Sequence, residues 1–141
     1  MSGNTGVQTQ QPDNTPLTRH SPALRESDSY LRTVFENAPI AMSLHSPDGR
    51  YLRVNKAAAD FFEYSAEELL TMSYHQTTHP DDLAVTNENF GKMIRNEHDV
   101  YQLEKRYVTK SGKTVWGMLC VSTVRDEAGQ PNFLIAQIAD I

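Results

Sequence analysis

Hydrophobic and polar residues alternate with two different periods along the chain. Over residues 26–36, and again from residue 80 to about residue 96, apolar positions recur every three or four residues, which predicts amphipathic helices. Over residues 40–54, and from residue 100 to the end, they recur at every second position, which predicts half-buried strands. Strands that are segregated from a central group of helices are typical of the α+β class.

Capping residues divide the central helical region. Asn55 follows the second strand and can cap one helix, and Ser65 with Glu68 has the spacing of a capping box for the next. His79 and Pro80 suit the N-cap and first position of a third helix. Asp81 and Asp82 then face the positive end of that helix dipole. Ser27 or Asp28 can cap the helix that precedes the first strand.

Tight connections separate the last three strands. The sequences "SGK" and "EAGQP" are short turn segments between long runs of period two. Short loops between adjacent long strands predict an antiparallel meander over residues 100–141.

Composition limits the class of protein. Residues 1–23 are rich in Ser, Thr, Asn, Gln, Gly and Pro, which predicts a disordered polar leader and not a signal peptide. No apolar run approaches the roughly 20 residues of a membrane helix. The net charge of −5, with mixed signs, argues against nucleic acid as a partner. The single cysteine, Cys120, excludes an internal disulfide and favours a cytoplasmic location.

Several segments together resemble a PAS domain of the sensory-box type with its C-terminal PAC motif. They are "VFENAPIAM", "SPDGRYLRVNKAAADFFEYSAEELL", "HPDD" and "EKRYVTKSGKTVWGMLCVSTVRDEAGQP", in that order. The resemblance implies a five-stranded antiparallel sheet, helices across one face and a cavity between them. The resemblance covers residues from about Leu31 to Ile141. Because the polar leader ends before Leu24, we expect the domain to span residues 24–141, made of a flanking helix (24–37), a PAS core (38–99) and the PAC meander (100–141).

The resemblance also predicts a second domain after this one. The last strand of such domains commonly ends in Asp-Ile-Thr, and this sequence ends in Asp140-Ile141. We therefore expect an N-terminal fragment of a larger bacterial-type signalling protein. Its C-terminal output domain would be a diguanylate cyclase or phosphodiesterase, or a histidine kinase.

The sequence lacks the residues with which relatives of this family bind two known cofactors, flavin and haem. Flavin-binding relatives use a cysteine in the middle helices, where this chain has "TMSYHQTTHP", and haem-binding relatives use a histidine inside the helix that here spans 81–97. We expect neither a covalent flavin adduct nor haem, and the cofactor is left unknown. His75 and His79 have the spacing of a metal-binding pair on a helix. The intervening polar residues and Pro80 favour a loop and a cap instead, so no metal site is expected.

A set of Met and Phe residues can line a ligand cavity, although the same residues can fill an ordinary core. The candidates are Met42, Phe61, Phe62, Met72, Phe90, Met93 and Met118. Trp116, Met118 and Cys120 share one face of a strand, and period two alone does not decide which face points at the helices.

No catalytic set with motif-level spacing is present, so the domain itself is not expected to be an enzyme. A small ketone isomerase, using one carboxylate in an apolar cavity, is the enzymatic alternative. The resemblance favours a sensory module that binds a small ligand or a partner protein and relays a change to an output domain. Homodimer and relay contacts are expected at Leu31, Val34, Phe35 and Asp140. The alternative is a structural homodimerisation module with a filled core.

Overall fold

The structure is a computed structural model that describes residues 22–141, and the chain divides into two units, residues 1–35 and 36–141. Apart from its last two positions, the expected disordered leader lies outside the described residues. Those two positions begin helix α1 (Pro22–Asn37), which includes every described residue of the first unit and extends two residues into the second. Because α1 begins before Ser27 and Asp28, neither residue is its N-cap, contrary to the sequence-based expectation.

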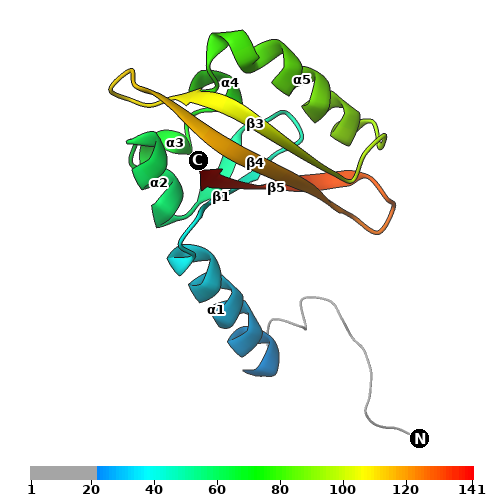
Figure 1. The fold of residues 1–141 in the computed structure, drawn as a ribbon. Helices are drawn as coiled ribbons and strands as arrows, with labels where there is room; N and C mark the ends of the chain where they lie inside the picture. Colours follow the sequence, from blue (N-terminus) through cyan, green and yellow to red (C-terminus); the bar gives the residue numbers. More distant parts are fainter. Residues whose placement is uncertain (1–21) are drawn as a thin grey trace, which may run out of the picture. The chain divides into compact units, whose positions relative to one another are not determined.

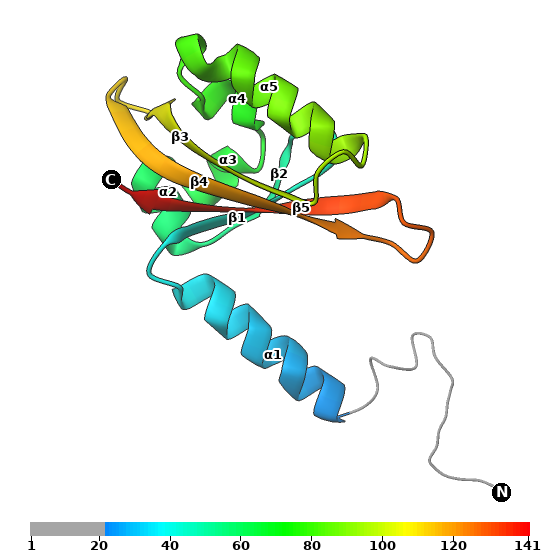
Figure 2. The same cartoon turned by 45° about the vertical axis from the view of Figure 1, so that its right-hand side comes forward.

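The second unit is built on one five-stranded antiparallel sheet, as predicted (Figure 1). Its strands in chain order are β1 (Ala41–His45), β2 (Tyr51–Val54), β3 (Val100–Val108), β4 (Thr114–Arg125) and β5 (Pro131–Asp140). Their order across the sheet is β2-β1-β5-β4-β3. The last strand in the sequence is therefore the central one, because β5 pairs with β4 on one side and with β1 on the other. The long β3-β4-β5 meander is clear in Figure 2.

The β1-β2 hairpin turns at a glycine that no other residue could replace without strain. Gly49 has φ of +93° and its N–H donates to the Ser46 carbonyl at 2.8 Å. A β-carbon at this position would lie 2.6 Å from Cε2 of Tyr74. The predicted "SPDG" turn thus also brings the first residue of a later helix close to the hairpin.

Four helices connect β2 to β3: α2 (Lys56–Phe62), α3 (Ala66–Leu69), α4 (Tyr74–Thr77) and α5 (Pro80–Ile94). The caps predicted for three of them are confirmed. The Asn55 side chain accepts from Ala58 N–H, Ser65 and Glu68 form a reciprocal capping box, and His79 Nδ1 accepts from Asp81 N–H at 3.0 Å. Helix α4 was not predicted, although Ser73 and Gln76 form a second capping box at its start.

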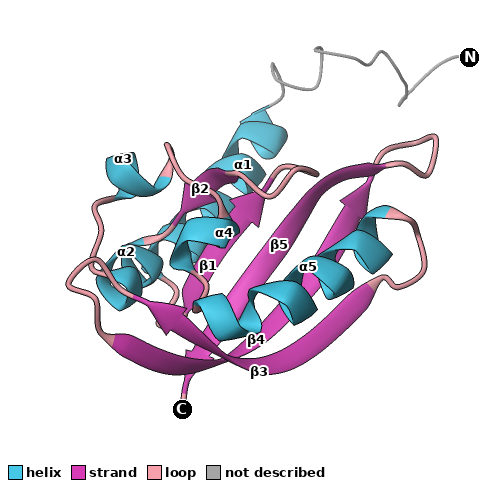
Figure 3. Cartoon of the chain, turned by 90° about the horizontal axis from the view of Figure 1, so that it is seen from above, coloured by secondary structure: helices cyan, strands magenta, loops and turns pink. Residues whose placement is uncertain are grey.

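The core lies between the sheet and these helices. Figures 1 and 3 show the helices α2 to α5 on one face of the sheet. Buried residues from both layers form one hydrophobic cluster, whose largest fully buried apolar members are Phe62, Leu69, Met93 and Leu134. Trp116, Met118 and Cys120 alternate with the buried Leu119 and Val121, so they lie on the opposite face.

Candidate functional site

A small cavity of about 30 Å³ lies between the central strands and the helices α4 and α5. Its polar lining residues are Ser43, His45, Tyr51, Tyr74, Thr86, Tyr101, Lys105 and Tyr107, and its apolar ones are Phe90, Leu119, Val121, Leu134, Ala136 and Ile138. A space of about 10–15 Å³ on this measure holds one water molecule. The cavity therefore has room for a species of very few atoms, whereas drug-sized ligands occupy roughly 300–1,000 Å³.

Lys105, on β3, is the buried cation of this cavity. Its residue is only 2% exposed because β3 places it on the inner face, two residues from the buried Tyr107. Its Nζ donates to Thr78 Oγ1 at 2.9 Å and lies 4.7 Å from the centre of the Tyr107 ring. Burial lowers the pKa of Lys105 to about 7, and Asp82 opposes this shift only in part. Burial therefore makes the protonated form of this amine costly near neutral pH.

Tyr107 contributes a hydroxyl that is buried without a hydrogen-bond partner among the described residues. An unsatisfied buried polar group costs about 1–3 kcal/mol, so such groups are rare and call for an explanation. Burial also raises the pKa of Tyr107 well above its ordinary value, which keeps the hydroxyl protonated and able to donate. By contrast, the hydroxyl of Tyr51 is paired with Thr77 Oγ1 at 2.8 Å.

His45, on β1, is held neutral at the other side of the cavity. Burial lowers its pKa to about 4, and its two ring nitrogens contact Gly49 O at 3.1 Å and Ser43 Oγ at 2.9 Å. A carbonyl can only accept, so Nδ1 carries the proton and donates to Gly49. Nε2 is then an acceptor, and the hydroxyl of Ser43 donates to it.

Gly117, on β4, allows the inner side chains to approach one another. It lies opposite Lys105 in the β3-β4 register. A β-carbon at Gly117 would meet Ile138 Cγ2 at 2.5 Å and Tyr107 Cε2 at 3.1 Å. The missing side chain is therefore what makes room for the Tyr107 ring beside the central strand.

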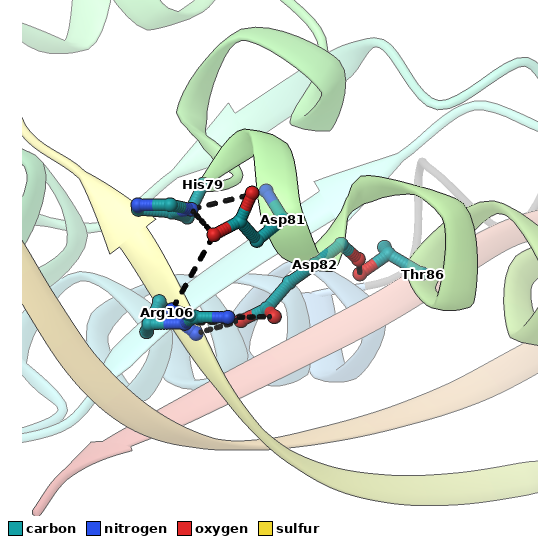
Figure 4. A network of polar contacts seen from close by, with 5 residues as sticks. All are labelled: His79, Asp81, Asp82, Thr86 and Arg106. Atoms are coloured by element: carbon teal, nitrogen blue, oxygen red, sulfur yellow. Dashed lines mark hydrogen bonds and ion pairs between the residues drawn. The ribbon is translucent and has the colours of Figure 1, made fainter.

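The "HPDD" segment fixes the start of α5 against β3 (Figure 4). Asp82 accepts from Arg106 Nη2 at 2.7 Å, from its Nε at 3.2 Å and from its backbone N–H at 2.7 Å. The Arg106 guanidinium thereby holds the pKa of Asp82 below its ordinary value. Asp81 makes only a longer contact with Arg106, at 3.8 Å, and its side chain is 71% exposed. Asp82 is thus an ion-pair partner as well as an acid at a helix start.

The structure brings together few of the residues that the sequence nominated for a cavity. Phe90 lines it. Phe62 and Met93 are buried in the core cluster, and Phe61 and Met72 pack against that cluster. Met42 and Met118 lie on the outer face of the sheet, since each alternates with buried inner-face neighbours, and this corrects their assignment to the cavity.

The other nominated residues lie elsewhere. Leu31, Val34 and Phe35 belong to α1, and Asp140 is exposed at the end of β5. His79 caps α5 as expected, whereas His75 lies in α4 and stacks on Tyr74 with ring centres 4.2 Å apart. Cys120 is half-buried on the outer sheet face and has a free thiol.

Lys105, Tyr107, His45 and Ser43 are among the cavity-lining residues that the sequence did not nominate. A signal for Lys105 was nonetheless present, because Leu103, Lys105 and Tyr107 share one side of a strand by period two. If that side faces the helices, Lys105 is buried with its apolar neighbours, and if it faces away from them, all three residues lie on the outer face of the sheet. The structure shows that this side is the inner one, where Lys105 and Tyr107 are both buried.

This geometry defines a class of small α+β domains in which one antiparallel sheet and a layer of short helices enclose a polar-lined cavity. A family model described as "PAS fold" matches residues 51–138, so the chain belongs to the PAS fold family. PAS domains are sensory modules, and the features that the sequence resemblance predicted for the sheet are confirmed.

The chain spans only 11–12% of the length of two curated relatives, which are much longer signalling proteins. The chain is 40% identical over 118 residues to the probable diguanylate cyclase DgcE of Escherichia coli, covering 84% of this chain and 11% of that protein. It is 25% identical over 119 residues to the sensor histidine kinase TmoS of Ectopseudomonas mendocina, covering 84% of this chain and 12% of that protein. The crystal structure of the PAS domain of an HTR-like protein from Haloarcula marismortui has the same fold. Its TM-score is 0.72 at 22% identity, over 87% of this chain and 98% of that one.

Among the helices of residues 22–141, none combines the length and the apolar character that crossing a membrane requires.

Proposed function

We propose that this PAS domain senses a small molecule in the cavity beneath β5 and relays its presence to an output domain in a longer chain. The observation that supports the proposal is the pair of buried, under-satisfied groups, Lys105 and the Tyr107 hydroxyl, lining one cavity. Groups of this kind destabilise the free domain and are stabilised when a ligand supplies the missing contacts. A ligand can shift a conformational equilibrium only by binding its two states differently.

The relay would use the central strand. The cavity is lined by Leu134, Ala136 and Ile138 of β5, so a ligand there contacts the strand that leads to Asp140. The relatives suggest two kinds of output, a diguanylate cyclase or a histidine kinase. We propose an output of one of these kinds, a cytoplasmic location and no catalysis by the domain itself.

The test is a native mass and absorption spectrum of the purified domain. A bound small molecule that is lost when Lys105 is replaced by Met supports sensing. An empty domain that also binds nothing from a metabolite extract would refute it.

The second candidate function is a structural homodimerisation module. The specific observation in its favour is the small volume of the cavity, about 30 Å³, which leaves the core almost filled. The outer face of the sheet carries apolar residues, among them Trp116, which is 49% exposed. In either case we propose a homodimer that uses this outer face together with Leu31, Val34 and Phe35 of α1.

Sedimentation of two matched variants tests the dimer. Trp116→Glu places a charge on the outer face, and we expect it to weaken self-association at least tenfold. Val85→Glu is the control, because Val85 is similarly exposed, at 42%, but lies on α5 in the helical layer. A wild-type domain that sediments only as monomer at micromolar concentration would contradict the dimer.

A further inference from the structure

Two polar groups of the cavity, the Tyr107 hydroxyl and the Lys105 amine, have hydrogen-bond donors left without an acceptor. The Tyr107 hydroxyl has no partner in the described part of the chain, and its raised pKa keeps it protonated. Protonated Lys105 has three N–H groups, of which Thr78 accepts one. Ser43 and His45 are already satisfied by each other and by Gly49. A molecule that pairs with both the Tyr107 O–H and protonated Lys105 must therefore offer acceptors.

Lys105 has no acidic partner in direct contact among the described residues. None of the described cavity-lining residues is an Asp or Glu, and no ion pair of the described chain includes Lys105. The nearest acidic influence comes from Asp82, whose carboxylate is committed to three contacts with Arg106. A buried cation without a counter-ion is costly, and an anion from outside would remove that cost.

The size of the cavity limits that anion to a few atoms. At about 30 Å³ it exceeds the space for one water but is far below that of a nucleotide, flavin or aromatic ligand. The apolar lining side chains, including Phe90 and Leu134, suit a short hydrocarbon end better than a second charge.

We propose that the ligand of this domain is a carboxylate of one or two carbons, such as formate or acetate, held between Lys105 Nζ and the Tyr107 hydroxyl. The proposal rests on the proposed sensing function and names the chemical class of its ligand. The bound carboxylate would accept from both donors and pair with the ammonium of Lys105. Because the ion pair favours protonated Lys105, binding near pH 8 would take up a proton from solution.

The experiment is calorimetric titration of the 141-residue chain with sodium formate and sodium acetate at pH 8. Sodium chloride keeps the ionic strength constant, and two buffers of different ionisation enthalpy reveal proton uptake. We expect saturable binding with uptake of up to one proton. We expect Lys105→Met to lower the affinity by roughly ten- to 100-fold, with Lys113→Met, an exposed lysine, as the unchanged control.

Tyr107→Phe separates binding from folding. It removes only the hydroxyl, which has no partner to lose among the described residues, so we expect unchanged or higher thermal stability without ligand. Its affinity for the carboxylate should nevertheless fall about tenfold. Equal carboxylate binding by wild type and Lys105→Met would overturn the inference, as would the absence of saturable binding of both salts to wild type. If the native mass spectrum instead shows a different bound molecule, the carboxylate proposal is refuted, whereas the proposed sensing function is supported.

Discussion

Replacing Lys105 by Met should remove a pH dependence of stability that burial of this amine creates. The pKa of Lys105 is about 7 in the folded domain and 10.5 in an exposed lysine. Between these values the unfolded chain binds more protons than the folded one, so stability rises with pH across this window. Below pH 7 both states are protonated, and the full cost of burying the charge is present. Each pH unit between the two pKa values corresponds to about 1.4 kcal/mol, which makes that cost about 5 kcal/mol.

The measurement runs from pH 6, just below this window, to pH 9, within it. Over that range the wild type should gain about 2–3 kcal/mol relative to Lys105→Met. The buried tyrosines do not interfere, because burial raises the pKa of Tyr107 well above its ordinary value and that of Tyr74 to about 12. His45 is neutral in the folded state throughout, since its pKa is about 4. Its unfolded-state titration is the same in both proteins and cancels in the difference.

Urea unfolding at fixed protein concentration measures this difference, with the fluorescence of Trp116, the chain's single tryptophan, as the signal. Lys113→Met is the control, because an exposed lysine should give a difference from wild type that does not change with pH. A wild-type-minus-Lys105→Met difference that stays constant within about 0.5 kcal/mol from pH 6 to 9 would show that Lys105 keeps an ordinary pKa. Burial would then not depress the pKa of this amine, contrary to the reasoning above.

Other parts of the structure give further predictions. Asp82→Asn should destabilise the domain by about 2–3 kcal/mol in urea unfolding, because it weakens three contacts to Arg106, whereas Asp81→Asn should cost less than about 1 kcal/mol. Since the pKa of Asp82 is lowered in the folded domain, the contribution of this residue to folding stability should be lost as the pH falls below about 4. An acid titration in which Asp82→Asn and wild type lose stability in parallel would contradict this. Gly117→Ala should lower the free energy of unfolding by about 1–3 kcal/mol, because the added β-carbon would lie 2.5 Å from Ile138. Gly91→Ala should be neutral or stabilising by up to about 1 kcal/mol, because its β-carbon meets only the flexible end of Arg95. Equal effects of the two changes would count against the packing argument.

Local signals in the sequence predicted the fold well. The change from a helical to an alternating period indicated the strand and helix regions, and Asn55, Ser65 and His79 indicated three helix starts. The five-stranded antiparallel sheet came from the family resemblance, because strand order depends on pairings between distant residues. Helix α4 was missed because its four residues are too few for a periodic pattern, and only its capping box indicates it.

The candidate site was predicted less well, for a reason that lies in the sheet. Met42 and Met118 were chosen for their residue type, but period two assigns a face only when the register is known, and both lie outside the core. Lys105 was passed over because a charged residue in a strand is usually exposed. Its burial depends on long-range contacts, namely the bare backbone of Gly117 across the strand pair and the Thr78 hydroxyl at the end of α4.

The pairing of β1 with β5 has a consequence for how such a domain is used in evolution. Ala41, at the start of β1, lies opposite Ile138, near the end of β5, so the polypeptide enters and leaves the sheet at neighbouring points. A folded unit with adjacent ends can be inserted into a chain, duplicated or deleted while the flanking segments keep their paths. The relatives, in which the matching region is only 11–12% of the length, are the kind of protein that such insertion produces.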